Sequence, residues 1–224
     1  VFGSVVANDG IDLEVKYGEI LALLGENGSG KTTLMNMLSG IYHPDKGNIY
    51  IAGKPEAINS PMDSIELGIG MIHQHFKLVE VFSAADNIVA GTKGKLKSKG
   101  AVRDEIKKIS EQLGLEVDPD KKVYNMSVSE KQTVEILKVL YRGAKILILD
   151  EPTEGIQPSI IQDIGAAIQK INEWKGITVL LVEQYLDFVL ENTNKLYVME
   201  KGEIVYANET KLADKDEVQR LMTE

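Results

Sequence analysis

The most informative segment of the chain is Gly25-Glu26-Asn27-Gly28-Ser29-Gly30-Lys31-Thr32. It fits the phosphate-binding pattern G-x-x-x-x-G-K-[ST] at every fixed position. Glycines let the backbone curl so that successive N–H groups point at the phosphates of a nucleotide. Lys31 supplies a positive charge for the outer phosphates, and the Thr32 hydroxyl can ligate Mg²⁺. The stretch therefore predicts a site for a nucleoside triphosphate.

The segments on either side of this loop favour the same interpretation. Residues 19–24 form an apolar run of strand length before the loop. Residues 33–39 follow it with a helical pattern that ends at Gly40. A strand, a glycine loop and a helix in this order direct a helix N-terminus at phosphate.

A second segment supplies the carboxylates that such a loop needs to hold Mg²⁺. The apolar run of residues 146–149 leads directly into Asp150 and Glu151. Asp150 can orient a metal-bound water, and Glu151 stands where a carboxylate can accept a hydrogen bond from an attacking water. The two segments together predict a site for ATP and Mg²⁺ with the capacity for hydrolysis.

The composition limits the class of protein. A chain of 224 residues with 43% hydrophobic residues and a mean hydropathy of -0.11 can form one large α/β domain, or a core with a small subdomain. No apolar run approaches the roughly 20 residues of a membrane helix, and residues 1–4 do not resemble a secretory signal. A net charge of -9 argues against broad nucleic-acid binding. The absence of cysteine fits a reducing compartment, and we expect a cytoplasmic protein.

The pattern along the chain predicts a core that is interrupted by helices. Apolar runs and turn residues predict strands at residues 11–15, 19–24, 48–52, 69–72, 146–149, 177–182, 196–199 and 203–206. Helical periodicity predicts helices at residues 102–113, 129–141, 159–174 and 211–224. Between residue 74 and about residue 140 we expect helices and no strand.

The string Asp150-Glu151-Pro152-Thr153, following such a loop, resembles the ATP-binding subunits of ABC transporters. The resemblance covers nearly the whole chain as one ABC-type ATP-binding domain, residues 1–224. It implies an α/β fold: a RecA-like P-loop NTPase core with a mainly parallel sheet, N-terminal antiparallel strands and an inserted α-helical subdomain. It assigns residues 1–73 and 142–224 to the core and residues 74–141 to the subdomain.

The same resemblance assigns roles to particular residues. Phe2 takes the place of the aromatic that stacks on adenine, Gln74 that of the glutamine that touches Mg²⁺ and senses a membrane partner, and Ser127 that of the signature serine. Gln184 stands where these ATPases carry a switch histidine. The implied catalytic residues are Lys31, Glu151 and Gln184, and the implied metal ligands are Thr32, Gln74 and Asp150. The implied nucleotide-binding residues are Phe2, Gly25, Glu26, Asn27, Gly28, Ser29, Gly30, Lys31, Thr32, Thr33, Gln74, Ser127 and Asp150.

The resemblance also implies partners. The signature serine caps a helix that faces the ATP of an opposite subunit, so the site is shared in a homo- or heterodimer of ATP-binding domains. Integral membrane permease subunits dock on the helical insertion. The expected location is therefore the cytoplasm, peripherally on the inner face of the cell membrane, with no nucleic-acid partner.

The chain departs from the family pattern at two sites. The signature, usually L-S-G-G-Q, reads Met126-Ser127-Val128-Ser129-Glu130. Side chains replace two glycines there, and Glu130 adds a negative charge where glutamine is usual. Gln184 has no proton to titrate, although it can donate a hydrogen bond to phosphate. Since Glu151 is present, we expect hydrolysis at a modest rate.

The two parts of the chain resemble different importers. Residues 68–79 and 127–138 resemble ATPases of nucleoside and simple-sugar uptake. Residues 154–159 and 181–185 resemble ATPases of urea and branched-chain amino-acid importers. Both a composite origin, joined within residues 150–153, and a divergent single lineage stay open. We expect a nucleoside or sugar importer, because the helical insertion lies in the first part.

Other functions fit the sequence less well. A soluble ABC ATPase of translation or DNA repair needs a second nucleotide domain, a long coiled coil or a zinc-binding insertion. A GTPase needs an N-K-x-D motif, which Asn194-Lys195 does not begin, and the pair His73 and His75 lacks a third metal ligand. A module that binds ATP and dimerises but scarcely hydrolyses it stays open because of the altered signature.

Overall fold

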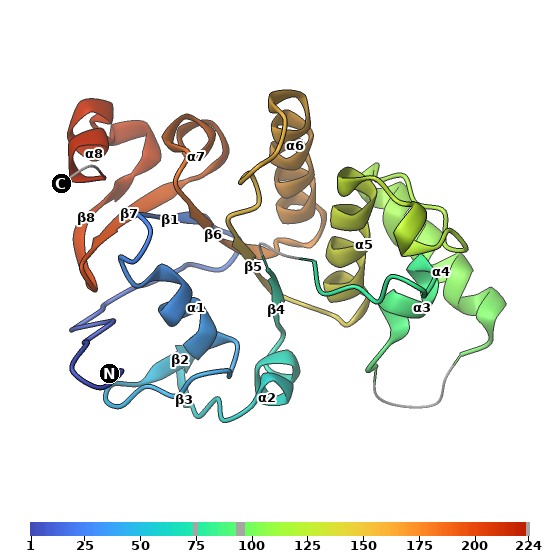
Figure 1. Ribbon diagram of the computed structural model, residues 1–224, viewed down its shortest axis with the longest axis horizontal. Helices are drawn as coiled ribbons and strands as arrows, with labels where there is room; N and C mark the ends of the chain where they lie inside the picture. Colours follow the sequence, from blue (N-terminus) through green and yellow to red (C-terminus); the bar gives the residue numbers. More distant parts are fainter. Residues whose placement is uncertain (74–75, 93–96, 223–224) are drawn as a thin grey trace.

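The computed structural model describes residues 1–73, 76–92 and 97–222. They fold around a six-stranded sheet with helices on both of its faces (Figure 1). The order of the strands across the sheet is β4-β5-β6-β1-β7-β8. Their bounds are β1 (Ile20–Leu24), β4 (Ile69–Ile72), β5 (Ile146–Asp150), β6 (Thr178–Glu183), β7 (Lys195–Glu200) and β8 (Glu203–Glu209). The α/β fold with a mainly parallel sheet is confirmed.

The register of the parallel strands brings the chemistry-bearing residues to one edge. All neighbouring pairs are parallel except β7 and β8, which form the predicted hairpin. Leu24 pairs with Glu183, and Asp150 pairs with Val182. Because the carboxyl ends of parallel strands meet at the same edge, the segments after β1, β5 and β6 lie together there.

Each face of the sheet has its own core. All five residues of β1 are buried, and alternate side chains point to opposite faces. Ile20, Ala22 and Leu24 pack in the larger core cluster, with residues of α6 (Pro158–Lys175) and α7 (Leu186–Asn192). Leu21 and Leu23 pack in a second cluster with Met35 of α1 (Lys31–Leu38). Burial on both faces explains why the central strands read as continuous apolar runs.

Helices follow β4 before the chain returns to the sheet at β5. They are α3 (Ala84–Val89), α4 (Lys99–Leu113), the short 3-10 helix η1 (Val123–Asn125) and α5 (Val128–Tyr141). The described part of this region contains no strand, and Figure 1 shows its helices beside the sheet. The predicted helices at 102–113 and 129–141 are confirmed by α4 and α5. The subdomain boundaries at residues 74 and 141 stay a prediction.

The predicted strand at residues 11–15 is wrong. Its apolar side chains alternate and lie half-buried against the second core cluster, but its backbone joins no described strand. A period of two shows which side chains face a core, whereas a strand also needs a neighbour with unpaired backbone groups. Of the described strands before β4, β2 (Ile49–Ile51) and β3 (Lys54–Glu56) form an antiparallel pair.

The short helices are not visible in the sequence pattern. α2 (Pro61–Glu66) begins after Ser60, whose side chain accepts a hydrogen bond from the N–H of Asp63. Helices of six or seven residues, such as α2, α3 and α7, complete fewer than two turns, so they show little periodicity. The predicted helical tail is confirmed in part by α8 (Lys215–Leu221), which the Asp214 carboxylate caps.

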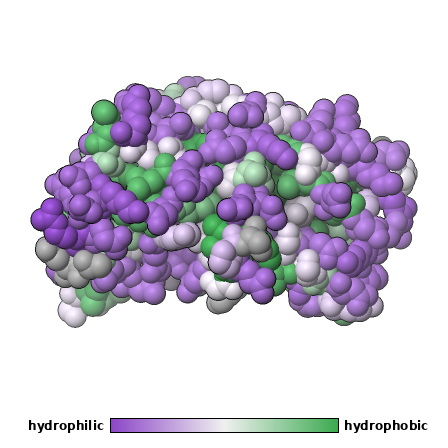
Figure 2. All heavy atoms as spheres, turned by 90° about the horizontal axis from the view of Figure 1, so that it is seen from above, coloured by the Kyte–Doolittle hydropathy of each residue, from purple (hydrophilic) through white to green (hydrophobic). Residues whose placement is uncertain are grey.

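The surface is mostly hydrophilic. Figure 2 shows one face of the molecule covered largely by hydrophilic residues, with hydrophobic residues visible between them. Among the described residues, no helix combines the length and the apolar character that a membrane span requires.

Candidate active site

The glycine loop lies between β1 and α1 and is enclosed by two other segments. Gly30 has a φ of 105°, and a Cβ atom there would lie 2.3 Å from the carbonyl oxygen of Ala7. The N–H of Gly202 donates to the carbonyl oxygen of Ser29 at 2.9 Å. Position 30 therefore admits only glycine for two reasons, its backbone conformation and the close approach of residue 7.

The Lys31 side chain is folded into the loop and is 3% exposed. Its Nζ donates to the carbonyl oxygens of Gly25 at 2.7 Å and Glu26 at 2.8 Å. The same atom lies 3.8 Å from a carboxylate oxygen of Glu151. Burial lowers the pKa of Lys31, and the nearby carboxylates, Glu151 first, oppose this shift. The loop thus fixes a cation at its centre.

A cavity of about 400 Å³ opens in front of the loop. The cavity is lined by residues of the phosphate loop and by two segments outside the motif, residues 5–7 and 201–202. The lining residues are Val5, Val6, Ala7, Asn27, Gly28, Gly30, Lys31, Thr32, Thr33, Lys201 and Gly202. The two remote segments meet at the loop only in the folded chain, so no local sequence pattern predicts them. Phe2 does not line this cavity. The residue is 49% exposed, and its ring contacts that of Tyr42 edge-on, with the ring centroids 5.3 Å apart.

Asp150 ends β5 as a buried carboxylate. Burial raises its pKa to about 6, the neighbouring charge of Glu151 adds to the shift, and Lys31 opposes it. Its Oδ1 is buried and has no hydrogen-bond partner among the described residues. A buried polar atom without a partner indicates that something binds there. Mg²⁺ prefers oxygen ligands such as carboxylates and hydroxyls, so it fits this position.

Glu151 and Gln184 lie beside the phosphate loop and contact each other. The Nε2 of Gln184 donates to Oε1 of Glu151 at 2.8 Å and to Oδ1 of Asn27 at 2.9 Å. Gln184 therefore links the loop to the carboxylate. Glu151 has a φ of 49°, the left-handed conformation that residues with a Cβ rarely adopt.

Ser127 lies away from this group, at the N-cap of α5. Its Oγ accepts from the N–H of Glu130 at 3.3 Å, and the Glu130 carboxylate accepts from the N–H of Ser127 at 2.8 Å. Lys121 also donates to Glu130 at 2.6 Å, and this contact is the main reason that the pKa of Glu130 is lowered. The charge of Glu130 is thus matched within its own chain. Gln74 lies outside the described residues.

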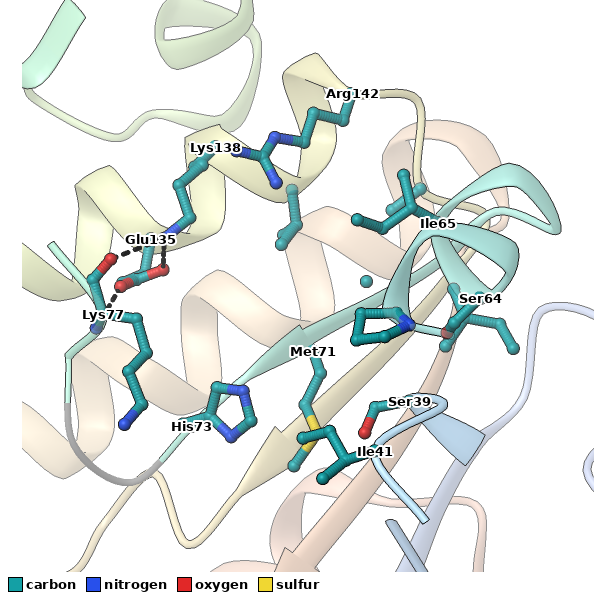
Figure 3. A pocket seen from close by; sticks show the side chains of 15 residues that line it. Ser39, Ile41, Ser64, Ile65, Met71, His73, Lys77, Glu135, Lys138 and Arg142 are labelled. Atoms are coloured by element: carbon teal, nitrogen blue, oxygen red, sulfur yellow. Dashed lines mark hydrogen bonds and ion pairs between the residues drawn. The ribbon is translucent and has the colours of Figure 1, made fainter. Parts of the chain in front are cut away.

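A second cavity of about 270 Å³ lies where α2 and β4 face α5 (Figure 3). Lys138 pairs with Glu135 at 2.5 Å, and the N–H of Lys77 donates to Glu135 at 2.7 Å. Arg142 donates to the carbonyl oxygen of Ala90, and its Nε is buried without a hydrogen-bond partner in the described part of the chain. His73 also points toward this cavity, and burial lowers its pKa. Cationic groups outnumber carboxylates in the lining.

Comparison with known proteins places the chain in a family. Residues 8–154 match the model of the ABC transporter family. This chain belongs to that family. The nucleoside import ATP-binding protein NupA of Lactococcus lactis subsp. cremoris (strain MG1363) is 44% identical over 207 residues, which cover 91% of this chain and 41% of that protein. The guanosine import ATP-binding protein NupO of Bacillus subtilis (strain 168) is 42% identical over 225 residues, 99% of this chain and 44% of that protein.

This chain spans less than half the length of these two relatives. Solved structures share its fold along almost all of it. An ATP-binding cassette of an ABC transporter in its ADP conformation superposes with a TM-score of 0.85 at 28% identity, covering 100% of this chain and 91% of the other. The cbiO1 structure from Clostridium perfringens, part of the ABC transporter complex cbiONQ, gives a TM-score of 0.83 at 28% identity, with coverages of 96% and 87%.

Proposed function

We propose that this chain binds ATP with Mg²⁺ and hydrolyses it to energise a membrane importer of nucleosides or simple sugars. The observation that carries the proposal is the meeting of Lys31, Asp150, Glu151 and Gln184 at the ends of β1, β5 and β6. The names of the relatives, which import nucleosides and guanosine, favour the same class of solute.

The phosphate loop and the carboxyl end of β5 divide the binding of Mg²⁺–ATP. The loop amides, the N-terminus of α1 and Lys31 hold the phosphates. Thr32, Asp150 and Gln74 would hold the ion, and the Oδ1 of Asp150, which has no hydrogen-bond partner among the described residues, fits this role. When bound, Mg²⁺ neutralises phosphate charge. Phe2 is assigned to the adenine and Ser127 to the ATP of the opposite subunit in a dimer.

The hydrolytic step is assigned to Glu151. Its Oε1 accepts a hydrogen bond from Gln184, and its second oxygen can accept a hydrogen bond from the attacking water. Glu151 then acts as the general base for that water. Gln184 holds the carboxylate in place, because its amide is always a donor whatever the pH.

The second cavity is assigned to a membrane permease. A short helix of the permease would enter between α2 and α5, where Met71 and Ile65 provide apolar surface (Figure 3). The cationic lining favours a segment with an acidic side chain, as does the Nε of Arg142, which has no hydrogen-bond partner in the described part of the chain. With such a partner, the chain would lie in the cytoplasm, on the inner face of the cell membrane.

The test of hydrolysis is phosphate release from ATP by the purified chain and its Glu151→Gln variant. We expect a fall of about 100-fold or more in turnover, the upper part of the range for loss of a general base, with ATP binding retained. Glu203→Gln, an isosteric loss of charge at an exposed position of β8, serves as the control. Equal turnover in the parent and Glu151→Gln would contradict the assignment.

A further inference from the structure

Glu183 ends β6 as a carboxylate that is only 2% exposed. Its Oε1 accepts hydrogen bonds from the N–H of Thr153 at 3.0 Å and from the Thr153 hydroxyl at 2.7 Å. Its Oε2 accepts from the N–H of Gln184 at 3.0 Å and from the N–H of Tyr185 at 3.3 Å. Four donors therefore converge on one buried side chain, which the proposed reaction itself does not use.

The four donors belong to two different segments. Thr153 lies in the segment after β5, two residues beyond Glu151. Gln184 and Tyr185 begin the segment after β6. Because each carboxylate oxygen serves one segment, Glu183 fastens the turn that carries the general base to the turn that carries its partner.

The turn at Glu151 needs such support because its backbone is strained. A residue with a Cβ in the left-handed region persists only where its surroundings hold it there. Two backbone N–H groups of this turn donate to the end of β6: that of Glu151 to the Val182 carbonyl oxygen at 2.9 Å, and that of Thr153 to Glu183. The second bond depends on a side chain, so a substitution can remove it without changing the strand.

We propose that Glu183 is a positioning residue for hydrolysis, which sets the contact between Glu151 and Gln184 by holding both turns. This inference rests on the proposed function, since it assigns Glu183 to the same reaction. It goes beyond that function because no contact of Glu183 with substrate is involved.

This clamp, formed by Glu183 with its donors on Thr153, Gln184 and Tyr185, requires a carboxylate. Burial raises the pKa of Glu183, and the hydrogen bonds from Thr153 and the following amides oppose this shift. A glutamine side chain has the same shape, but only its carbonyl oxygen accepts hydrogen bonds. In Glu183→Gln the amide NH₂ would face the N–H groups of one of the two turns, so that turn would lose its anchor.

Steady-state turnover of ATP tests the proposal in Glu183→Gln, Thr153→Val and Thr153→Ser. We expect Glu183→Gln to lower kcat at least tenfold while KM for ATP stays within about twofold of the parent. Thr153→Val, which loses only the hydroxyl, should lower kcat about threefold, and Thr153→Ser, which keeps it, should restore the parent value. Glu203→Gln is the matched control for loss of charge.

The results that overturn the proposal are equally definite. An unchanged kcat in Glu183→Gln, or a fall in kcat no larger than the loss of folded protein, would overturn it. If Glu183→Gln does not fold, the two Thr153 variants decide, because equal kcat values in Thr153→Val and Thr153→Ser would overturn the clamp.

Failure of the proposed function gives a different result. If the parent chain shows no turnover, hydrolysis is wrong, and amide hydrogen exchange then decides the clamp alone. We expect either the Thr153 amide or the Gln184 and Tyr185 amides to exchange at least tenfold faster in Glu183→Gln, with no change in Glu203→Gln. Unchanged exchange at all three amides, those of Thr153, Gln184 and Tyr185, would overturn the positioning role.

Discussion

Asp150 is a buried carboxyl group with Glu151, a group of like charge, next to it and Lys31 as the opposing charge. Its pKa of about 6 lies above the ordinary value of 3.8. An acid whose pKa is higher in the folded protein than in the unfolded chain destabilises the fold when it is ionised. At neutral pH the ionised Asp150 therefore lowers the stability of the fold. We attribute its presence to ligand binding rather than to folding.

Replacement of this carboxyl should stabilise the fold. A shift of this size corresponds to about 3 kcal/mol at most, so we expect Asp150→Asn to raise the free energy of unfolding by about 1 to 3 kcal/mol at pH 7.5. As the pH falls from 7 through 6 toward 4, the folded parent takes up the proton first, and the difference should shrink. Urea unfolding in Mg²⁺-free buffer measures both values.

The control for this prediction is Asp104→Asn, at an exposed position of α4. It should leave the free energy of unfolding within about 0.5 kcal/mol of the parent. A variant Asp150→Asn that is less stable than the parent at pH 7.5 would contradict the buried-charge account.

Part of the site could be predicted from single residues and part could not. Lys31, Thr32, Asp150 and Glu151 follow from local motifs, because the loop and the strand end carry their own chemical signal. Glu183 carries no such signal: a glutamate at the end of an apolar strand reads as a solvated terminus. Its role appears only when the register of β5 and β6 brings Thr153 to it.

At the scale of the elements, two residues of the altered signature also stabilise helix α5. Its N-cap pair, Ser127 and Glu130, forms a reciprocal capping box, so the glutamate that departs from the family pattern stabilises the helix that carries the serine. This contact explains how a negative charge is tolerated at the position where the signature usually has glutamine.

Loss of this cap should affect both folding and association. We expect Ser127→Ala to cost about 1 kcal/mol of stability, the usual cost of losing an N-cap. In a Glu151→Gln background with saturating Mg²⁺–ATP, it should also weaken the dimer, which light scattering measures. Ser98→Ala removes the N-cap of α4 and is the matched control, because it should cost similar stability without weakening the dimer. Equal dimer formation in both variants would contradict the shared site.

The elements themselves were predictable where burial is continuous or the helical period is long. Strands β1, β5 and β6 and helices α4, α5 and α6 all meet one of these conditions. Residues 11–15 were not predictable in this way, because their apolar side chains alternate as in a strand but their backbone pairs with no described strand. The short helices depend on their caps and on tertiary contacts that a single segment does not reveal.

For the molecule as a whole, we propose that the first cavity takes the nucleotide and the second takes the membrane partner. Arg142 lies in the second cavity and not in the first. We therefore expect Arg142→Glu to abolish the stimulation of turnover by a nucleoside- or sugar-type permease in membranes while ATP binding stays unchanged. Charge substitutions in the described residues 76–82 should act in the same direction.

Arg103→Glu is the control for this prediction, because Arg103 is exposed and pairs with Asp120 on the helical insertion. It should leave the stimulation intact. Equal loss in both variants would show a general effect of charge rather than docking. Preferential capture of an amino-acid-type permease in a side-by-side pull-down would contradict the choice of partner.

The composite origin of the chain stays a prediction. Residues 1–150 and 153–224 would have to be compared with relatives separately, because an alignment over the whole chain averages the two parts. If both parts match the same lineage best, the composite hypothesis is wrong.

Titration calorimetry of Mg²⁺–ATP binding decides whether the glycine loop and the strand ends form the site for ATP. Lys31→Ala removes the buried cation, at a cost of about 2 to 3 kcal/mol for a lost charge-assisted contact. We predict an affinity about 30- to 150-fold weaker than that of the parent. The control Lys211→Ala, at an exposed lysine that pairs with Glu209, should bind like the parent. Undiminished affinity in a folded Lys31→Ala would contradict the account.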